Sequence, residues 1–346
     1  LGRSPRYGLD ITAAHPGQIL DCPVEVTIDA GWRTLWQASF PSSSRIHTSQ
    51  AHAQAWGLED TTLPFGMLLN LTLCLAVESF SESCTLHLGI RDAVQIAPAH
   101  INDSLSGKVR IESMRNTSAG DASVIVTTHL LLNQRQECVF RLQKYSYYPP
   151  IPEHALENAK PPTQDVESAF PISSNGGLLD HLLAYESPPN VLGQKLNSGE
   201  VILHPAVRPI GHSENLLLTT LFRNTHPVHF DTLRFGHDGL IVCGGFVQAL
   251  AHACTERELR PIVDESLEYS HHIHPVSPGE RIGSVSRVLE RRRLSAHLEE
   301  VRVMTLGLRE VDVSAELAGR PIPAALFSPN EMKPSAIQEL CRRSCP

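Results

Sequence analysis

The sequence predicts an α+β fold in which one unit occurs twice, each unit a curved antiparallel sheet wrapped around a long apolar helix. Both halves show the same order of a polar loop, an apolar helix entered through glycine, and a strand ending at a turn, at an offset of about 180 residues. The halves are separated by a segment dense in proline and small polar residues, typical of a linker. We therefore predict domains at 1–148 and 191–330, a linker at 149–190 and a tail at 331–346.

The first unit begins with a polar loop at 40–60, followed by a helix at 68–80 and strands within 85–114. The helix, LLNLTLCLAVESF, is apolar on nearly every face, which is typical of a helix buried inside its own sheet. His47 in the loop and Gly66 before the helix are expected to correspond to residues of the second unit.

The second unit repeats this order with a loop at 222–239, a helix at 244–253 and strands within 266–290. The helix GGFVQALAHA is again apolar nearly all round. His229 corresponds to His47, and Gly245 corresponds to Gly66. A duplicated fold is the economical explanation, with the two halves forming an intramolecular pseudo-dimer.

Composition indicates an ordinary globular protein, with 41% hydrophobic residues and a net charge of -8 over 346 residues. No basic field suits nucleic acid; Arg291–Arg293 lies among acidic residues and is expected on a hairpin rim, or as a phosphate contact. No apolar run is long enough to span a membrane, and the first residues lack a signal-peptide core. We expect a cytoplasmic protein whose cysteines are mostly reduced and buried.

The second loop combines Asn224, His226 and His229 just ahead of a helix that begins with glycine. Hydration of an enoyl thioester needs a base for water and hydrogen-bond donors at the carbonyl oxygen, so this order suits an acyl-thioester hydratase. We predict His229 as the general base or acid and Gly245 as the carbonyl donor, with Asn224 orienting water or the imidazole. The alternatives are a histidine that only ties the loop to the sheet, and a glycine required by close helix packing. Asp231 is expected to cap a helix.

The segment 224–231, Asn-Thr-His-Pro-Val-His-Phe-Asp, resembles the Asp-x-Asn-Pro-(Ile/Leu)-His-x-Asp motif of MaoC-type hydratase domains in the hot-dog superfamily. It departs at Asn224, which cannot ionise, and at His226. The second half is more similar to the two-domain mesaconyl-CoA hydratases, or beta-methylmalyl-CoA dehydratases, whose Gln-Asn-Thr-Ala-Arg-Val-His-Phe-Asn pattern contains the asparagine. Phe235-Gly236 and Ile241–Gly245 also match that family's pattern.

The resemblance implies a double hot-dog lyase that hydrates a 2-enoyl thioester or dehydrates a 3-hydroxyacyl thioester, without metal or redox cofactor. Coenzyme A or a carrier-protein pantetheine would carry the acyl group, with a branched dicarboxylic group favoured. We expect His226, His272 and Arg223 to bind substrate, Arg223 or Arg234 meeting the distal carboxylate. The first half, with Ser42 where the catalytic Asp would be, is expected to be degenerate.

Several alternatives stay open from the sequence. A dehydratase acting on a carrier-bound polyketide and a catalytically inactive acyl-binding protein are both compatible with the loss of the motif aspartate. A thioesterase would require a carboxylate near the second helix, and none is evident there. The histidines at 271–274 could hold a metal or line the pocket. Acyl chain length, stereochemistry, reaction direction and formation of a homodimer are left undetermined.

Overall fold

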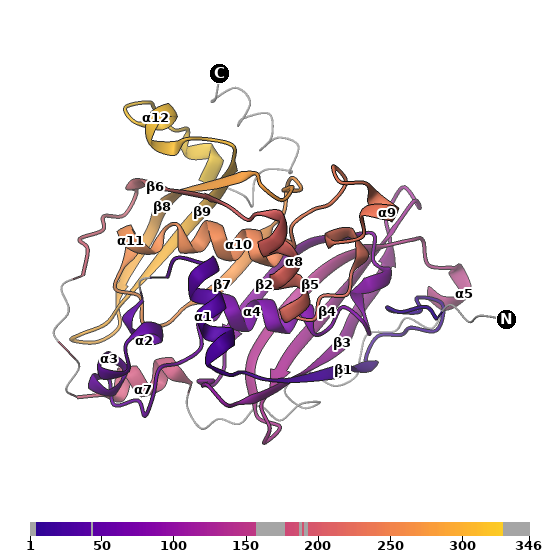
Figure 1. Ribbon diagram of the computed structural model, residues 1–346, viewed down its shortest axis with the longest axis horizontal. Helices are drawn as coiled ribbons and strands as arrows, with labels where there is room; N and C mark the ends of the chain where they lie inside the picture. The colour runs from indigo at the N-terminus through magenta and orange to yellow at the C-terminus, as the bar shows by residue number, and fades with distance from the viewer. Residues whose placement is uncertain (1–4, 43, 157–176, 187–188, 190–192, 328–346) are drawn as a thin grey trace.

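A large antiparallel sheet forms one wall of the molecule. The computed structural model describes residues 5–42, 44–156, 177–186, 189 and 193–327 (Figure 1). The sheet has six strands in the order β1-β3-β4-β5-β2-β7. The first half supplies five of them: β1 (Ile19–Thr27), β2 (Leu86–Gln95), β3 (Ser104–Asn116), β4 (Ser123–Leu132) and β5 (Cys138–Tyr148).

The second half contributes a smaller, three-stranded antiparallel sheet in the order β6-β8-β9. Its strands are β6 (Val201–Pro209), β8 (Arg281–Arg293) and β9 (Glu299–Arg309). At the far end of the β8–β9 hairpin, Arg291 and Arg292 pair with Glu299 and Glu300 at 2.7 and 3.0 Å. The basic run Arg291–Arg293 therefore lies at the charged end of a hairpin, which was the first of the two positions predicted for it.

The strand β7 (Ser266–His271) differs from the expectation that each half keeps its own sheet. It pairs antiparallel with β2, so that Gly89 lies opposite His271. In the first half β5 lies between β4 and β2, whereas the chain after β9 forms the short helices α12 (Val313–Leu317) and η3 (Ala324–Phe327). Within the described part of the second half nothing takes the place of β5, and β7 joins the sheet of the first half.

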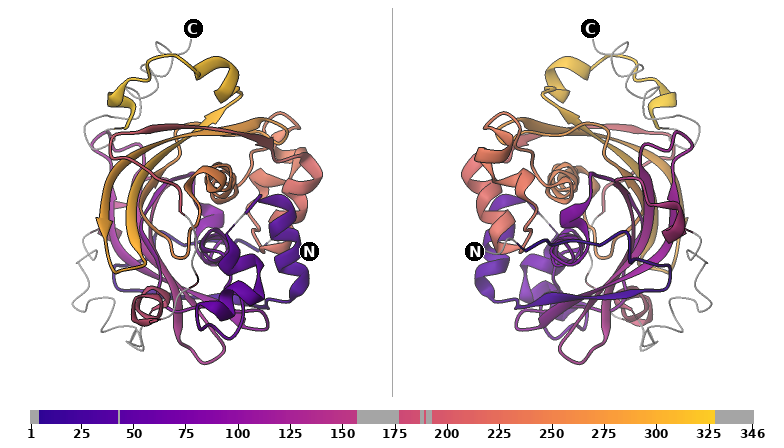
Figure 2. Two further views of the ribbon diagram at one scale, coloured as in Figure 1. Left: turned by 90° about the vertical axis from the view of Figure 1, so that its left-hand side faces the viewer. Right: turned by 90° about the vertical axis from the view of Figure 1, so that its right-hand side faces the viewer.

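Two apolar helices, α4 (Phe65–Cys74) and α10 (Gly244–Ala253), lie inside the two sheets, as the end-on views of Figure 2 show. Their contacts make them antiparallel, because Gly66 near the start of α4 lies beside Ala249 in the second half of α10. Their sequences were predicted to be buried helices, and nearly all of α4 is buried. Small residues let the two backbones approach, since a β carbon on Gly66 would lie 3.6 Å from that of Ala249. The Nδ2 of Asn70 donates to the carbonyls of Gly66 and Gly245 at 2.8 and 3.1 Å.

The side of the helix pair that the sheets leave open is covered by further helices (Figure 2). They include α1 (Ala30–Ser39), α2 (Arg45–Thr48), α3 (Gln50–Ala55) and α8 (His212–Leu221). Trp32 of α1 packs edge-on against Phe222 at 5.2 Å, and Phe222 packs against Phe246 of α10 at 5.3 Å. One aromatic cluster therefore joins the covering helices of both halves to the central helix α10.

Matching backbone contacts support the predicted duplication. The N–H of Leu63 donates to the carbonyl of Ala99 at 2.8 Å, and that of Val242 donates to Val276 at 2.8 Å. Each contact lies just ahead of a central helix and ties the loop to the turn that follows the next strand. Ala99 and Val276 therefore occupy equivalent positions in the two halves.

The predicted linker contains two short helices, α5 (Glu153–Leu156) and α7 (Leu178–Ala184). Leu178 and Leu182 of α7 pack against Ile46 and Trp56, which fixes this part of the segment to the first half. Much of the linker and the predicted tail lie outside the described residues. Of the helices described, none is both long and apolar enough to cross a membrane.

Candidate active site

Most of the predicted site residues gather where the N-terminus of α10 meets the C-terminus of α4. The loop between α8 and α10 contains η2 (Pro227–His229) and α9 (Thr232–Phe235). Asn215 of α8 positions this loop, because its Nδ2 donates to the carbonyl of His229 at 2.9 Å. Nothing in the sequence marks Asn215 as a positioning residue, since it lies on an ordinary amphipathic helix.

His229 is buried, with 9% of its surface exposed. Its Nδ1 lies 2.9 Å from the carbonyl oxygen of Ile241. Because a carbonyl only accepts, Nδ1 carries the hydrogen and the lone pair of the neutral ring is on Nε2. Burial lowers the pKa of His229 to about 4, so the ring is neutral at pH 7. The residue is therefore in the protonation state that a general base requires.

Asn224 and His226 lie on the same side of the loop. The Oδ1 of Asn224 accepts the N–H of His226 at 3.1 Å, and its Nδ2 lies 3.8 Å from Sγ of Cys74. Among the described residues, the second hydrogen of that amide has no acceptor. The His226 ring lies 5.8 Å from the His229 ring, and burial lowers the pKa of His226. The structure thus brings the three predicted polar residues together.

Two thiols at the site were missed by the sequence analysis, which treated them only as small apolar residues. Cys74 ends α4, and Cys243 precedes the first residue of α10. A hydrogen bond from the Cys74 thiol, together with the backbone N–H groups of Gly245 and Phe246, lowers the pKa of Cys243 to about 7. The Gly245 N–H is therefore one of the groups that favour the charged form of this thiol.

The two glycines that open α10 have different surroundings. Gly245 is buried, and a β carbon there would lie 2.3 Å from Oδ1 of Asn70. Gly244 is partly exposed, and a β carbon there would lie 2.9 Å from Cε1 of His272. No backbone partner is seen for the Gly244 N–H within the described residues. Close packing accounts for Gly245, and Gly244 faces the polar cluster.

Replacing Gly245 with alanine is expected to lower the free energy of unfolding by about 1–3 kcal/mol, because the added methyl overpacks a fixed side chain. Asn70 cannot yield easily, since it is fully buried and donates to two carbonyls. Urea titration of Gly245→Ala and Gly66→Ala would measure this. The added methyl on Gly66 would come no closer than 3.2 Å to Trp36. An equal or larger loss for Gly66→Ala would contradict the packing account.

His272 joins the cluster from the turn after β7. Its ring meets that of His87 on β2 edge-on at 4.9 Å, and burial lowers the pKa of His272 to about 4. The neighbouring His271 and His274 are exposed. No group of three or more potential ligand side chains is close enough to hold a metal in the part of the chain that the structure describes. The His272 ring lies beside Gly244, and its place in an acyl pocket stays a prediction.

Two arginines predicted to meet a substrate carboxylate lie elsewhere. Arg223 is exposed, at a left-handed backbone position (φ 62°) that ends α8. Arg234 is exposed on α9, with its guanidinium over the ring of Phe235. Both face solvent, so the prediction that either contacts a buried acyl group is not supported. The Oδ1 of Asp231 accepts the N–H groups of Leu233 and Arg234, which confirms its expected role as a helix cap.

The corresponding place in the first half has a different chemistry. The Nδ1 of His47 lies 3.1 Å from the Thr62 carbonyl, which repeats the contact of His229 with Ile241. The hydroxyl of Ser42 donates to Glu256 at 3.0 Å and is therefore engaged in a structural contact. This half retains the histidine, while the residues around it differ.

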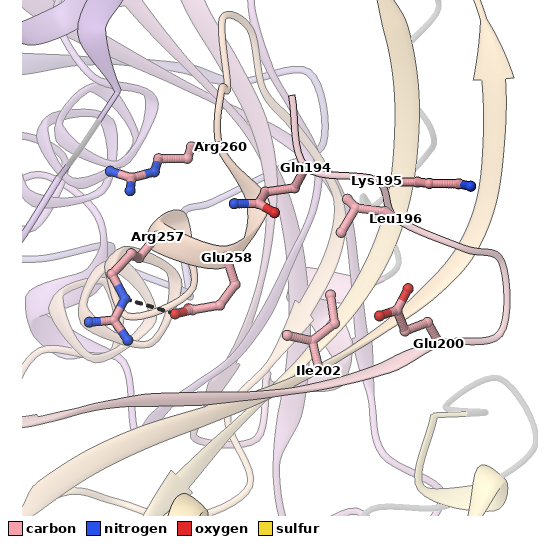
Figure 3. A pocket seen from close by; sticks show the side chains of 8 residues that line it. All are labelled: Gln194, Lys195, Leu196, Glu200, Ile202, Arg257, Glu258 and Arg260. Carbon is pink, nitrogen blue, oxygen red and sulfur yellow. Dashed lines mark hydrogen bonds and ion pairs between the residues drawn. The ribbon is translucent and has the colours of Figure 1, made fainter. Parts of the chain in front are cut away.

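An open cleft of about 380 Å³ lies apart from these residues, between the start of β6 and α11 (Glu256–Leu259) (Figure 3). Arg257 and Glu258 pair across part of it at 2.9 Å. The carboxylate of Glu258 also meets Nδ1 of the buried His204 at 2.9 Å, and Nε2 of that ring meets Ser286 at 2.9 Å. His204 and Ser286 are both fully buried, so this network ties the sheet to the helix.

Comparison with known proteins supports the predicted resemblance. The chain is 25% identical over 299 residues to mesaconyl-CoA hydratase of Cereibacter sphaeroides, covering 82% of each chain. It is 23% identical to beta-methylmalyl-CoA dehydratase of Chloroflexus aurantiacus, covering 85% of this chain and 86% of the relative. No protein-family model matches the sequence.

Solved structures confirm the double hot-dog fold. A MaoC-domain dehydratase, so described, from Chloroflexus aurantiacus superposes with a TM-score of 0.73 at 21% identity, covering 93% of this chain and 92% of that chain. A Mycobacterium tuberculosis protein described as having a double hot-dog fold superposes with a TM-score of 0.69 at 16% identity, covering 91% and 94%. The predicted α+β architecture is therefore confirmed, apart from the placement of β7.

Proposed function

We propose that the chain is a hydro-lyase that catalyses the reversible addition of water to a 2-enoyl thioester. The observation that carries this proposal is a buried, neutral imidazole at the entrance to a central hot-dog helix. His229 donates through Nδ1 to Ile241, leaving Nε2 free to accept a proton. Relatives over most of the chain are named hydratase and dehydratase.

In the hydration direction, Nε2 of His229 takes a proton from water while the water oxygen bonds to C3 of the enoyl group. The resulting imidazolium then returns a proton to C2, giving the 3-hydroxyacyl thioester. Dehydration is the reverse sequence. Asn224, whose amide retains one free hydrogen, would orient the water. The scheme is carried by proton transfer and hydrogen bonds alone, so we propose no metal or redox cofactor.

Negative charge gathers on the thioester oxygen as C3 is attacked, and a backbone donor at a helix N-terminus would stabilise it. We assign this role to the N–H of Gly244 in preference to that of Gly245. Gly244 is partly exposed beside His272, whereas Gly245 is buried against Asn70 and its N–H acts on the thiol of Cys243. His226 and His272 would line the acyl pocket on either side of this donor.

A single working site would also explain why the halves differ. Ser42 lies where a motif acid would be, and its hydroxyl is bound to Glu256. The described second half lacks a strand equivalent to β5, which in the first half adjoins the candidate site. We therefore propose that the first half shapes the pocket for the second.

The substrate that we favour is a branched 2-enoyl group of the mesaconyl type, carried by coenzyme A. Purified protein should decrease the enoyl absorbance of such an ester, and the product should contain one added water by mass. Activity on esters of carrier protein alone would replace coenzyme A with carrier-bound pantetheine. Binding of both kinds of ester by folded protein without turnover would refute the enzyme and leave an acyl-binding protein.

A further inference from the structure

A buried lysine lies on the face of β5 that points toward the central helices. Along β5 the buried residues alternate with half-buried ones from Phe140 to Tyr148. This alternation places Lys144 in the buried row, where apolar residues normally lie. Only 4% of its surface is exposed.

Lys144 has no anionic partner among the described residues. Its ammonium makes no hydrogen bond or ion pair there, and it lies 5.6 Å from the centroid of the Phe80 ring. Burial lowers the pKa of Lys144, and the groups that act on it electrostatically are the thiols of Cys84, Cys243 and Cys74. No carboxylate is among them.

Strand pairing connects this lysine with the candidate active site. Ser146, two residues along the same row, lies opposite His87 on β2. His87 contacts His272, whose ring lies against Gly244 at the start of α10. The positive charge of Lys144 also acts on the rings of His226 and His229, whose pKa values it helps to lower.

Several polar atoms around Lys144 also lack partners among the residues that the structure describes. They are Nε2 of His87, Nε2 of His272, Nδ1 of His129 and the hydroxyl of Ser146. Buried polar atoms are rarely left without a partner in native proteins, and an unpaired buried charge is still more costly. A cation surrounded by unsatisfied neutral groups suits an anion that is part of a ligand.

We propose that Lys144 binds the free carboxylate of a dicarboxylic acyl group, and so selects acid-bearing enoyl thioesters over uncharged ones. This inference rests on the proposed function, because it places the acyl group between His229 and β5. It replaces the exposed Arg223 and Arg234 as partners for that carboxylate. The described second half has no strand equivalent to β5, so this subsite belongs to one of the two pseudo-symmetric sites.

The test compares two coenzyme A esters that differ only in this group: mesaconyl-CoA and 2-methylbut-2-enoyl-CoA, in which a methyl replaces the carboxylate. Wild-type protein should have the higher kcat/KM for mesaconyl-CoA. Lys144→Met should lower that value by roughly 10- to 150-fold, which corresponds to loss of a charge-assisted hydrogen bond. Turnover of the methyl ester should be unchanged or increased.

Lys108→Met is the matched control, because Lys108 lies on β3 of the same sheet and pairs with Asp21 instead. It should leave the preference unchanged. Thermal unfolding provides a readout independent of activity: Lys144→Met should melt at a higher temperature, since it removes an unpaired buried charge. Free mesaconate should inhibit wild-type protein more strongly than free 2-methylbut-2-enoate.

The outcomes separate the two proposals. Equal turnover of both esters by wild-type protein, or an unchanged preference in folded Lys144→Met, would overturn the role of Lys144 and leave the hydratase intact. Failure of wild-type protein to hydrate either acyl group, whether coenzyme A or carrier protein carries it, would overturn both proposals. Should Lys144→Met fail to fold, the ester preference of wild-type protein and its inhibition by the two free acids still test whether a carboxylate is recognised.

Discussion

Replacing His229 with asparagine is expected to lower kcat/KM for hydration by about 10²- to 10⁴-fold, the range for removing a general base. The asparagine amide can still donate to the carbonyl of Ile241, as Nδ1 of the histidine does at 2.9 Å. The loop should therefore keep its conformation while the proton acceptor is lost. Initial rates measured from the enoyl absorbance, with the melting temperature recorded alongside, would test this.

His47→Asn is the natural control for that variant. His47 makes the same contact with the Thr62 carbonyl in the other half, at 3.1 Å, and the same change removes the same atoms. It should leave the rate within a few-fold of wild type if the first half is degenerate. Equal losses in the two variants would assign catalysis to both halves, and retention of full activity by His229→Asn would eliminate His229 as the base.

Lowering the pH from 7 to 5 is expected to lower the free energy of unfolding by several kcal/mol. Burial lowers the folded-state pKa of His229 and His272 to about 4, and it also lowers the pKa of His129 and His87. In the unfolded chain these rings have a pKa near 6.5. Between pH 6.5 and 4 the unfolded chain therefore binds more protons than the folded protein. The free energy of unfolding falls as the pH is lowered through this range. His229 and His272 should each contribute about 2 kcal/mol at pH 5.

Urea unfolding at a series of pH values would measure this dependence. His129→Leu removes one fully buried ring whose Nδ1 has no partner in the described structure, and should flatten the dependence below pH 6.5. His237→Leu removes an exposed ring and should leave it unchanged. Parallel curves for wild type and His129→Leu would show that this ring does not titrate on unfolding.

The sequence allowed the central helices and the site histidine to be predicted because their signals are local. GGFVQALAHA coincides with α10, and the polar loop ahead of it contains the contacts of Asn224 and His229. The first helix was predicted at 68–80, whereas α4 begins at Phe65 and ends at Cys74. The residues after Cys74 are still mostly buried, but they form turns instead of helix. The apolar run therefore predicted where the helix lies but not where it ends.

Features that depend on pairing between distant segments could not be read from periodicity. The sequence of β7 suits a strand in either sheet, and only the structure shows that it pairs with β2. The sequence did not single out Lys144, and only the structure shows that it lies in the buried row of β5 without an ionic partner among the described residues. Likewise, the two glycines of α10 differ only through the neighbours Asn70 and His272.

The pairing of β7 with β2 joins two edges that would meet between separate subunits if the halves were unlinked. A covalent link turns such an encounter into an intramolecular one with a fixed effective concentration. The joint between the halves is therefore insensitive to dilution of the protein. The two copies are always present in a one-to-one ratio, so a changed copy never pairs with another changed copy. One copy can therefore lose its catalytic residues while the other keeps them.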